Sequence, residues 1–207
     1  MKEQIDWFLY ERAAHEEGYT TLCGIDEAGR GPLAGPVFAA AVVLPLDASI
    51  AGLNDSKKLS EKKREALFDE ICQTAVSYGI GSADVAEIEQ FNILNATFLA
   101  MARAVNGLNM PCDCALVDGN RIPHTLDIPA FTIVHGDALS ASIAAASILA
   151  KVSRDRYMLA MAERYPEYAF EKHKGYGTKL HVERIRAHGP CEIHRPLFLR
   201  KILGNRS

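Results

Sequence analysis

The chain has 207 residues, of which 48% are hydrophobic and 24% charged, and its formal net charge at pH 7 is −3. This balance excludes collagen-like and disordered chains and is typical of a globular protein with one large domain, alone or with an appendage. The longest apolar run, residues 37–44, is too short to cross a bilayer, and no signal segment is evident, so we expect no membrane association.

The first half of the chain predicts both helices and strands. Periodicity and breaker residues predict, in chain order, a helix over 5–17, strands over 19–26 and 37–44, a helix over 60–77 and a strand over 78–83. The turn between the first two strands is short, so we expect them to pair as an antiparallel hairpin.

The second half also predicts helices and strands, and it ends in helices. It predicts a helix over 93–105, strands over 115–118 and 130–134, a long helix over 140–164, and helices around 181–188 and 196–202. Alanine and serine dominate the first half of the long helix, which suits close packing on a sheet. The order of elements predicts an α/β fold with a mixed sheet and helices on both faces.

Cysteine spacing indicates a cellular compartment. The five cysteines form no regular framework, which favours reduced thiols and a cytoplasmic protein. Cys112 and Cys114 are the only close pair, and for them a buried pair is favoured over half of a zinc site.

Charge is unevenly distributed along the chain. Residues 170–207 hold nine Lys or Arg against three Asp or Glu, a formal +6 that leaves −9 for the rest. A basic segment beside an acidic body suits a protein that grips phosphates in one place and metal ions in another. A solvated basic helix explains the same charges equally well.

Carboxylates follow several of the predicted strands. Asp26 and Glu27 end the first strand, Asp118 ends the strand over 115–118, and Asp137 follows the strand over 130–134. Magnesium prefers oxygen ligands, and two such ions can activate water and stabilise the leaving oxygen of a phosphodiester. Each lone aspartate fits a turn or a cap equally well, but the combination favours a metal site.

Geometry separates Asp155 from these candidates. A helix over 141–155 would span roughly 21 Å, so Asp137 and Asp155 can hardly share one cluster. Asp155 is four residues from Lys151, and an ion pair is its favoured role. Adjacent strand residues face opposite sides. Either the chain therefore bends before Gly29, or Glu27 contributes through its backbone carbonyl.

Six motifs in order resemble one family. They are Asp-Glu-Ala-Gly-Arg-Gly-Pro-Leu-Ala-Gly-Pro at 26–36, with further motifs at 53–60, 92–97, 117–120, 144–155 and 173–178. Together they resemble bacterial ribonuclease HII, the type 2 ribonuclease H family, from about residue 22 to about residue 195. The resemblance implies a ribonuclease H-like mixed sheet flanked by helices. It divides the chain into an N-terminal helical extension (1–18), a catalytic domain (19–168) and a basic helical C-terminal region packed on it (169–207).

The resemblance also implies an activity. The family is composed of endoribonucleases that hydrolyse the RNA strand of RNA/DNA hybrids and cleave 5′ to ribonucleotides embedded in duplex DNA. Two divalent ions, Mn2+ or Mg2+, act with substrate bound, and the products carry 3′-hydroxyl and 5′-phosphate ends. We therefore expect a monomeric enzyme that removes ribonucleotides from DNA.

By motif, the resemblance assigns roles to residues. The metal-binding, catalytic carboxylates fall on four acidic residues: Asp26, Glu27, Asp118 and Asp137. The substrate-binding positions are Gly29, Arg30 and Gly31, which read the ribose 2′-hydroxyl, Lys57 and Lys58, which contact phosphate, and Tyr176, which stacks on the adjoining deoxyribose.

Several of these residues fit other roles from sequence alone. Lys57 and Lys58 equally suit a solvated approach to a helix, and Tyr176 equally suits a packed loop. His173 could be a ligand or a proton shuttle, although a hydrogen-bonding loop histidine is favoured. His135 departs from the family, which more usually has lysine before Gly-Asp.

A hybrid-binding module and a phosphotransferase are the alternatives to the nuclease. A non-catalytic hybrid-binding module of the same fold would have lost a metal carboxylate, and none of the four is missing. A nucleotide-dependent phosphotransferase would need a P-loop, and no G-x-x-x-x-G-K-[ST] occurs.

Overall fold

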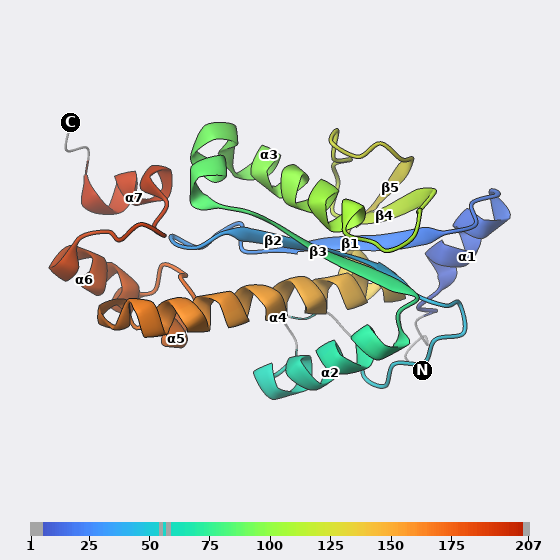
Figure 1. The fold of residues 1–207 in the computed structure, drawn as a ribbon, viewed down its shortest axis with the longest axis horizontal. Helices are drawn as coiled ribbons and strands as arrows, with labels where there is room; N and C mark the ends of the chain where they lie inside the picture. The colour runs from blue at the N-terminus through green and yellow to red at the C-terminus, as the bar shows by residue number, and fades with distance from the viewer. Residues whose placement is uncertain (1–5, 54–55, 57–58, 205–207) are drawn as a thin grey trace.

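A five-stranded mixed sheet forms the centre of the molecule in the computed structural model, which describes residues 6–53, 56 and 59–204 (Figure 1). The strands are β1 (Leu22–Ala28), β2 (Val37–Val43), β3 (Ser77–Ala83), β4 (Cys114–Asp118) and β5 (Ala130–Ile133). They lie in the order β3-β2-β1-β4-β5. β2 is antiparallel to both β1 and β3, whereas β4 is parallel to both β1 and β5. The predicted hairpin and the predicted mixed sheet are confirmed.

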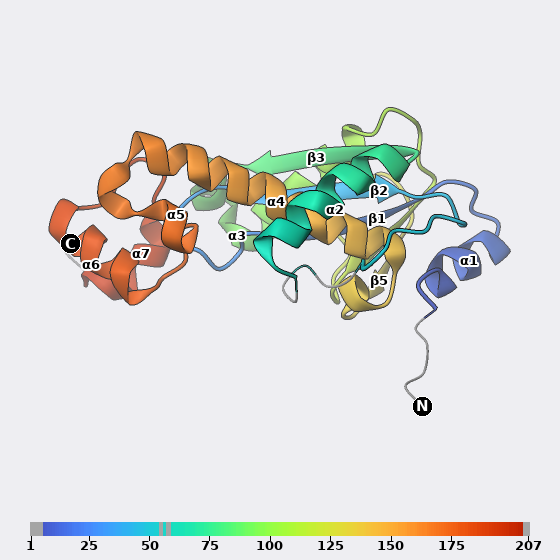
Figure 2. The same cartoon turned by 90° about the horizontal axis from the view of Figure 1, so that it is seen from below.

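Helices cover both faces of this sheet (Figures 1 and 2). They are α1 (Leu9–Glu16), α2 (Glu61–Thr74), α3 (Val85–Asn106), α4 (Ala141–Arg164), α5 (Phe170–His173), α6 (Lys179–His188) and α7 (Pro196–Leu203), with short 3-10 helices η2 (Gly136–Ala138) and η3 (Pro166–Tyr168). α3 lies on one face, and α2 and α4 lie on the other. α5, α6 and α7 gather at one end of the molecule, and α1 lies at the other end.

Strand alternation divides the core into two layers. Cys23 and Ile25 of β1 pack in the cluster on the α3 side, whereas Ala28 packs with α2 and α4. Gly24 lies beneath the start of α4, where a Cβ would come within 2.2 Å of the carbonyl carbon of Ser142. The small residues of α4, predicted to allow close packing, therefore bring its backbone against β1.

Two helices differ from their predicted limits for local reasons. α1 begins at Leu9, after a turn in which the Asp6 carboxylate accepts the Phe8 N–H at 3.3 Å. α3 begins eight residues before the predicted position, at Val85, because Asp84 starts it with a capping box. Asn92 interrupts α3 with φ 64° and ψ 165°, and only the part after this kink matches the predicted helix.

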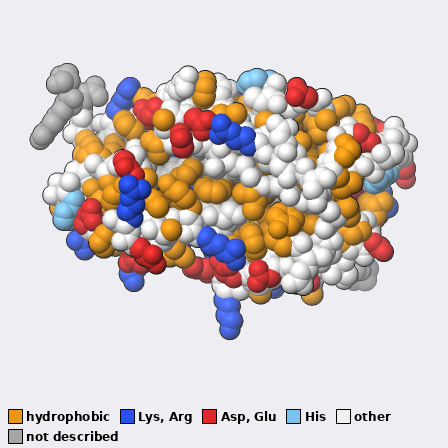
Figure 3. Space-filling view, viewed as in Figure 1, with side chains coloured by type: hydrophobic (Ala, Val, Ile, Leu, Met, Phe, Trp, Pro, Cys, Tyr) orange, Lys and Arg blue, Asp and Glu red, His pale blue; other side chains and the backbone are white. Residues whose placement is uncertain are grey.

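The C-terminal charge excess does not form one continuous basic patch on the face shown in Figure 3, where acidic and basic side chains are interspersed. A third hydrophobic cluster joins the end of α4 to the C-terminal helices and contains Met158, Phe170 and Leu199. Among the helices of the described residues, none is long and apolar enough to cross a membrane.

We predict that Gly24→Ala lowers the free energy of unfolding by about 3 kcal/mol, because the added methyl group would push the α4 backbone off the sheet. Urea denaturation would measure this loss. Gly31→Ala is the matched control, since a Cβ there meets nothing within 4 Å. Equal unfolding free energies for the two variants would contradict the packing described here.

Candidate active site

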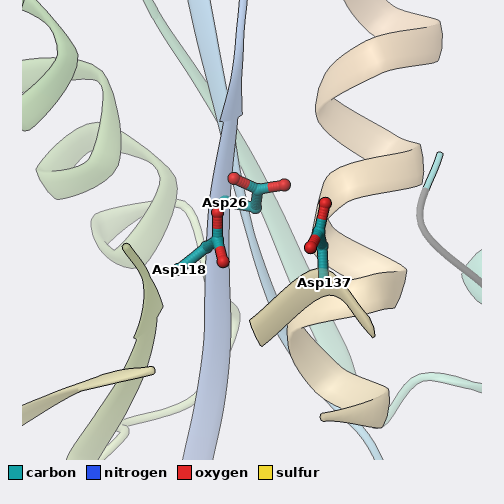
Figure 4. A group of neighbouring side chains, drawn as sticks. All are labelled: Asp26, Asp118 and Asp137. Carbon is teal, nitrogen blue, oxygen red and sulfur yellow. The ribbon is translucent and has the colours of Figure 1, made fainter. Parts of the chain in front are cut away.

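Three aspartates converge at one edge of the sheet (Figure 4). Asp26 comes from β1, Asp118 ends β4 and Asp137 lies in η2. One carboxylate oxygen of each lies within 4.8 Å of the others. Because β1 and β4 are parallel, their carboxyl ends reach the same edge, and the turn after β5 brings Asp137 beside them.

Backbone N–H groups hold two of these carboxylates. Asp118 Oδ1 accepts the Gly136 N–H at 2.7 Å, which ties the end of β4 to the turn that carries Asp137. Asp26 Oδ1 accepts the Glu27 N–H at 2.7 Å. This turn begins at His135, whose φ of 59° lies in the left-handed region. Backbone N–H groups thus fix the side chains of Asp26 and Asp118, and the bond to Gly136 holds the turn that carries Asp137.

Electrostatic repulsion makes this cluster a fit for a cation. Asp26 is 4% exposed and Asp137 is 5% exposed. Burial, with the neighbouring charges of Glu27 and Asp118, raises the pKa of Asp26 well above its usual range. A divalent ion bound to the oxygens would offset this repulsion, and carboxylate oxygens are the donors that Mg2+ and Mn2+ prefer.

Glu27 lies apart from the three-aspartate group. β1 stays paired with β2 through Ala28, so alternation turns Glu27 toward the α3 side. There it lines a pocket of about 230 Å³ with Asp118 and Arg30. Arg30 Nη1 lies 3.4 Å from Glu27 Oε1. The predicted metal role of Glu27 stays a prediction.

The Gly29–Gly31 turn directly follows β1. Gly29 has φ 101°, and a Cβ there would lie 2.1 Å from Nε of Arg154, so only glycine fits this position. Gly31 is exposed and has open space around it. The absence of a side chain at Gly31 thus leaves room for a partner outside the protein.

Tyr176 lies on the loop after α5. Its side chain is 42% exposed, and its ring centroid is 5.9 Å from Lys151 Nζ and 5.6 Å from Arg154 Cζ. The loop is joined to the glycine turn region by the Leu33 N–H, which donates to the Gly175 carbonyl at 2.8 Å. The structure therefore connects two segments that are far apart in the sequence.

Two buried histidines, His181 and His194, anchor the Tyr176 loop to the protein interior through hydrogen bonds. The Cys191 N–H donates to His194 Nδ1 at 2.9 Å, so the neutral ring carries its proton on Nε2. His194 Nε2 then donates to His181 Nε2 at 3.1 Å, and His181 Nδ1 donates to the Tyr176 carbonyl at 2.9 Å. Only neutral histidines satisfy this chain, because a second proton would place two N–H groups against each other.

Other predicted residues have structural roles or lie outside the described residues. Asp155 forms the predicted ion pair, with Lys151 Nζ at 2.6 Å. His173 is buried and hydrogen-bonded. Its Nε2 lies 3.0 Å from the Tyr168 carbonyl oxygen, and its Nδ1 accepts the Gly175 N–H. Lys57 and Lys58 fall outside the described residues.

Sequence reasoning missed several residues around the site. They are Ser147, whose hydroxyl bonds to Asp26, and the buried side chains Arg154, His181, His194 and Arg195. Ser147 and Arg154 stand in the motif at 144–155, which could have pointed to them. The histidines and Arg195 carry no sequence signal for their positions, because the partners of each become neighbours only in the fold.

A larger hollow of about 830 Å³ lies between α6, α7 and the start of α3. None of the predicted site residues lines it. The carboxylate cluster, rather than this larger hollow, holds the chemistry that the sequence indicates.

Comparison with known proteins identifies the family. The family model for ribonuclease HII matches residues 23–201. The chain belongs to the ribonuclease HII family. A ribonuclease HII of Caldicellulosiruptor bescii is 53% identical over 203 residues, covering 98% of each chain. One from Endomicrobium trichonymphae is 58% identical over 191 residues, covering 92% of this chain and 91% of the relative.

The fold of the ribonuclease HII chain also resembles a solved relative. The ribonuclease H2 from Pyrococcus horikoshii OT3 superposes with a TM-score of 0.72 and 26% identity, covering 88% of this chain and 97% of that chain. The chain is thus an endoribonuclease, a phosphodiester hydrolase that acts on RNA/DNA hybrids. The family depends on divalent metal ions, and the three aspartates supply suitable donors. The enzyme is favoured over the non-catalytic binding module.

We predict that Gly31→Ala keeps the stability of the wild-type protein but lowers kcat/KM for ribonuclease HII substrates at least about tenfold, because its methyl group would occupy space that the substrate needs. Cleavage kinetics on a duplex with one ribonucleotide, with thermal unfolding alongside, would measure both. Unchanged kinetics would show that no partner approaches Gly31 closely.

Acid should destabilise this ribonuclease HII through its buried histidines. Burial, with neighbouring histidine charge, lowers the pKa of His181 and of His194 from 6.5 to about 4. Between pH 6.5 and pH 4 the unfolded chain therefore binds more protons than the folded chain, and stability falls as pH falls. Each histidine should cost about 3 kcal/mol at the acid end of this window.

Denaturation measured across this window in His181→Asn should show a shallower fall, since asparagine can still donate to the Tyr176 carbonyl but does not titrate. His188→Asn is the control, because His188 is exposed. The same slope in His181→Asn and wild type would contradict the assignment.

Proposed function

We propose that Asp26, Glu27, Asp118 and Asp137 hold two divalent ions that cleave the phosphodiester on the 5′ side of a ribonucleotide. The observation that carries this proposal is the approach of three aspartate oxygens to within 4.8 Å of one another. When bound, such ions activate the attacking water and stabilise the departing 3′-oxygen. The products would carry 3′-hydroxyl and 5′-phosphate ends.

The proposed metal ligands lie on the two sides of β1. Asp26, Asp118 and Asp137 lie toward α4 and would hold an ion between them. Glu27 lines the pocket on the other side with Asp118, so we propose that it binds an ion only when substrate phosphate completes the ligand set. The raised pKa of Asp26 supports its part, because the burial and the repulsion from Glu27 and Asp118 that raise it would be offset by a bound cation.

We propose that the turn after β1 and the loop that carries Tyr176 recognise the substrate. The backbone of Gly29, Arg30 and Gly31 would hydrogen-bond the ribose 2′-hydroxyl, the group that distinguishes RNA from DNA. The open space at Gly31 supports this. The exposed ring of Tyr176 would stack on the next sugar, where a deoxyribose presents an apolar face. Lys57 and Lys58, outside the described residues, would contact phosphate.

The proposed cellular task is removal of ribonucleotides from DNA. We propose that the enzyme works as a monomer in the cytoplasm and uses Mg2+ or Mn2+. RNA/DNA hybrids and duplex DNA containing ribonucleotides would be its nucleic-acid partners.

Replacement of a proposed ligand should abolish cleavage without unfolding the protein. We predict that Asp26→Asn and Asp118→Asn each lower kcat about a thousandfold on a duplex with one ribonucleotide. Asp69→Asn is the control, because Asp69 is exposed on α2. Near-normal cleavage by either ligand variant would refute the assigned roles.

Metal removal gives a separate prediction. Chelation should abolish cleavage, and adding back Mg2+ or Mn2+ should restore it, because the carboxylates alone cannot activate the water. The assay would compare an all-RNA strand, a four-ribonucleotide patch and a single ribonucleotide in duplex DNA with each ion. Cleavage in the presence of excess chelator would contradict the mechanism.

A further inference from the structure

Arg195 lies beneath the turn that follows β1 and donates hydrogen bonds to its carbonyl groups. Nη2 donates to the Gly29 carbonyl at 2.7 Å, and Nη1 donates to those of Arg30 at 3.1 Å and Pro32 at 3.0 Å. Nε donates to the Gly35 carbonyl at 2.8 Å. The residue is 0% exposed, so one buried guanidinium group holds four carbonyls of a single turn.

These bonds fix the direction of two N–H groups. A peptide unit is planar and trans, so its C=O and N–H point in opposite directions. The Gly29 carbonyl shares a peptide unit with the Arg30 N–H, and the Arg30 carbonyl shares one with the Gly31 N–H. Because Arg195 holds both carbonyls toward the protein interior, both N–H groups point away from it. They point toward the surface, since Arg30 and Gly31 are exposed.

Both N–H groups are available to a partner outside the protein. Within the described part of the chain, neither donates to a backbone or side-chain acceptor. A Cβ on Gly31 would meet nothing within 4 Å, so the space beside Gly31 is open, and both residues are exposed. Two adjacent, outward N–H groups on such an exposed turn suit a hydroxyl oxygen.

We propose that Arg195 is a positioning residue for recognition of the ribose 2′-hydroxyl, which it serves by holding the Gly29 and Arg30 carbonyls inward and so presenting the Arg30 and Gly31 N–H groups to the substrate. This inference rests on the proposed function of the Gly29–Gly31 turn. Arg195 itself touches no substrate in this arrangement.

The guanidinium group suits this task better than another cation. It is planar and carries five donors in a fixed fork, whereas a lysine ammonium is a point charge with three donors. Burial, with the nearby Arg154 charge, lowers the pKa of Arg195 to about 9, which leaves it charged at neutral pH. Its hydrogen bonds to the carbonyls are therefore charge-assisted and hold the turn firmly.

A second buried arginine provides a matched control. Arg154 is also 0% exposed and also donates to backbone carbonyls, those of Ala34 and Lys174 at 3.0 Å and of Pro36 at 3.3 Å. Its side chain packs against Gly29, a contact that the aliphatic part of a lysine can keep, but it donates a hydrogen bond to neither the Gly29 nor the Arg30 carbonyl. Lysine substitution at Arg154 should therefore cost stability, as at Arg195, without turning the two N–H groups.

The test measures discrimination between ribose and deoxyribose. KM would be determined for a duplex with one ribonucleotide, and Ki for the all-DNA duplex of the same sequence as a competitor. For Arg195→Lys we expect Ki to stay within about twofold of wild type and the ratio of Ki to KM to fall on the order of tenfold, the loss of one good hydrogen bond. For Arg154→Lys the ratio should stay within about twofold of wild type.

Different results would overturn different claims. If the ratio for Arg195→Lys matched that for Arg154→Lys, Arg195 would not position the turn. If the wild-type protein bound both duplexes equally well, the proposed recognition of the ribose 2′-hydroxyl by the Gly29–Gly31 turn would be wrong. A loss of stability alone would lower the active fraction and hence kcat, but would leave the ratio unchanged.

A measurement on the unmodified chain guards against a variant that does not fold. Amide hydrogen exchange of the free wild-type protein, followed by NMR, should place the Arg30 and Gly31 N–H groups in the fast-exchanging class. Protection of either group would mean that it is already bonded within the protein, and the inference would be wrong.

Discussion

Repulsion between buried carboxylates is the constraint on which the rest of this structure depends. Three aspartates approach within 4.8 Å, and two of them are almost fully buried, an arrangement that opposes folding. The chain opposes this repulsion with fixed N–H donors, from Glu27 to Asp26 and from Gly136 to Asp118. Burial and the neighbouring charges of Glu27 and Asp118 raise the pKa of Asp26, and a bound cation would make the same geometry favourable. The parallel pairing of β1 with β4 and the dense packing of α4 are what keep the aspartates from moving apart.

A single strand serves both layers of the molecule. Successive residues of β1 alternate, so Asp26 faces α4 and Glu27 faces the pocket beside α3. The turn at Gly29 then begins with no intervening residue other than Ala28. The metal binding proposed for both sides of β1 and the proposed recognition of a sugar are thus arranged along one short stretch of backbone. Movement of this stretch would disturb both proposed functions together.

The sequence predicted what local patterns determine. The strands, the long α4 and the antiparallel hairpin follow from periodicity, and the six motifs led to the family and to three aspartates that the structure brings together. The start of α3, which the capping box at Asp84 sets, was missed because the kink at Asn92 interrupts the helical periodicity. The parts played by Arg195 and His181 could not be predicted, because their partners lie far away in the sequence and depend on how the C-terminal helices pack.

The attachment of Arg195 to the turn also determines when the site can be completed. Arg195 bonds to Gly35 across 160 positions of the chain. During synthesis, β1 and its carboxylates leave the ribosome early, and N-terminal parts of a protein generally fold first. The turn at Gly29 must wait until Arg195 has emerged as well. A chain still unfinished at Arg195 would therefore hold the acidic side chains of β1 but lack the contacts that order the turn proposed to select RNA.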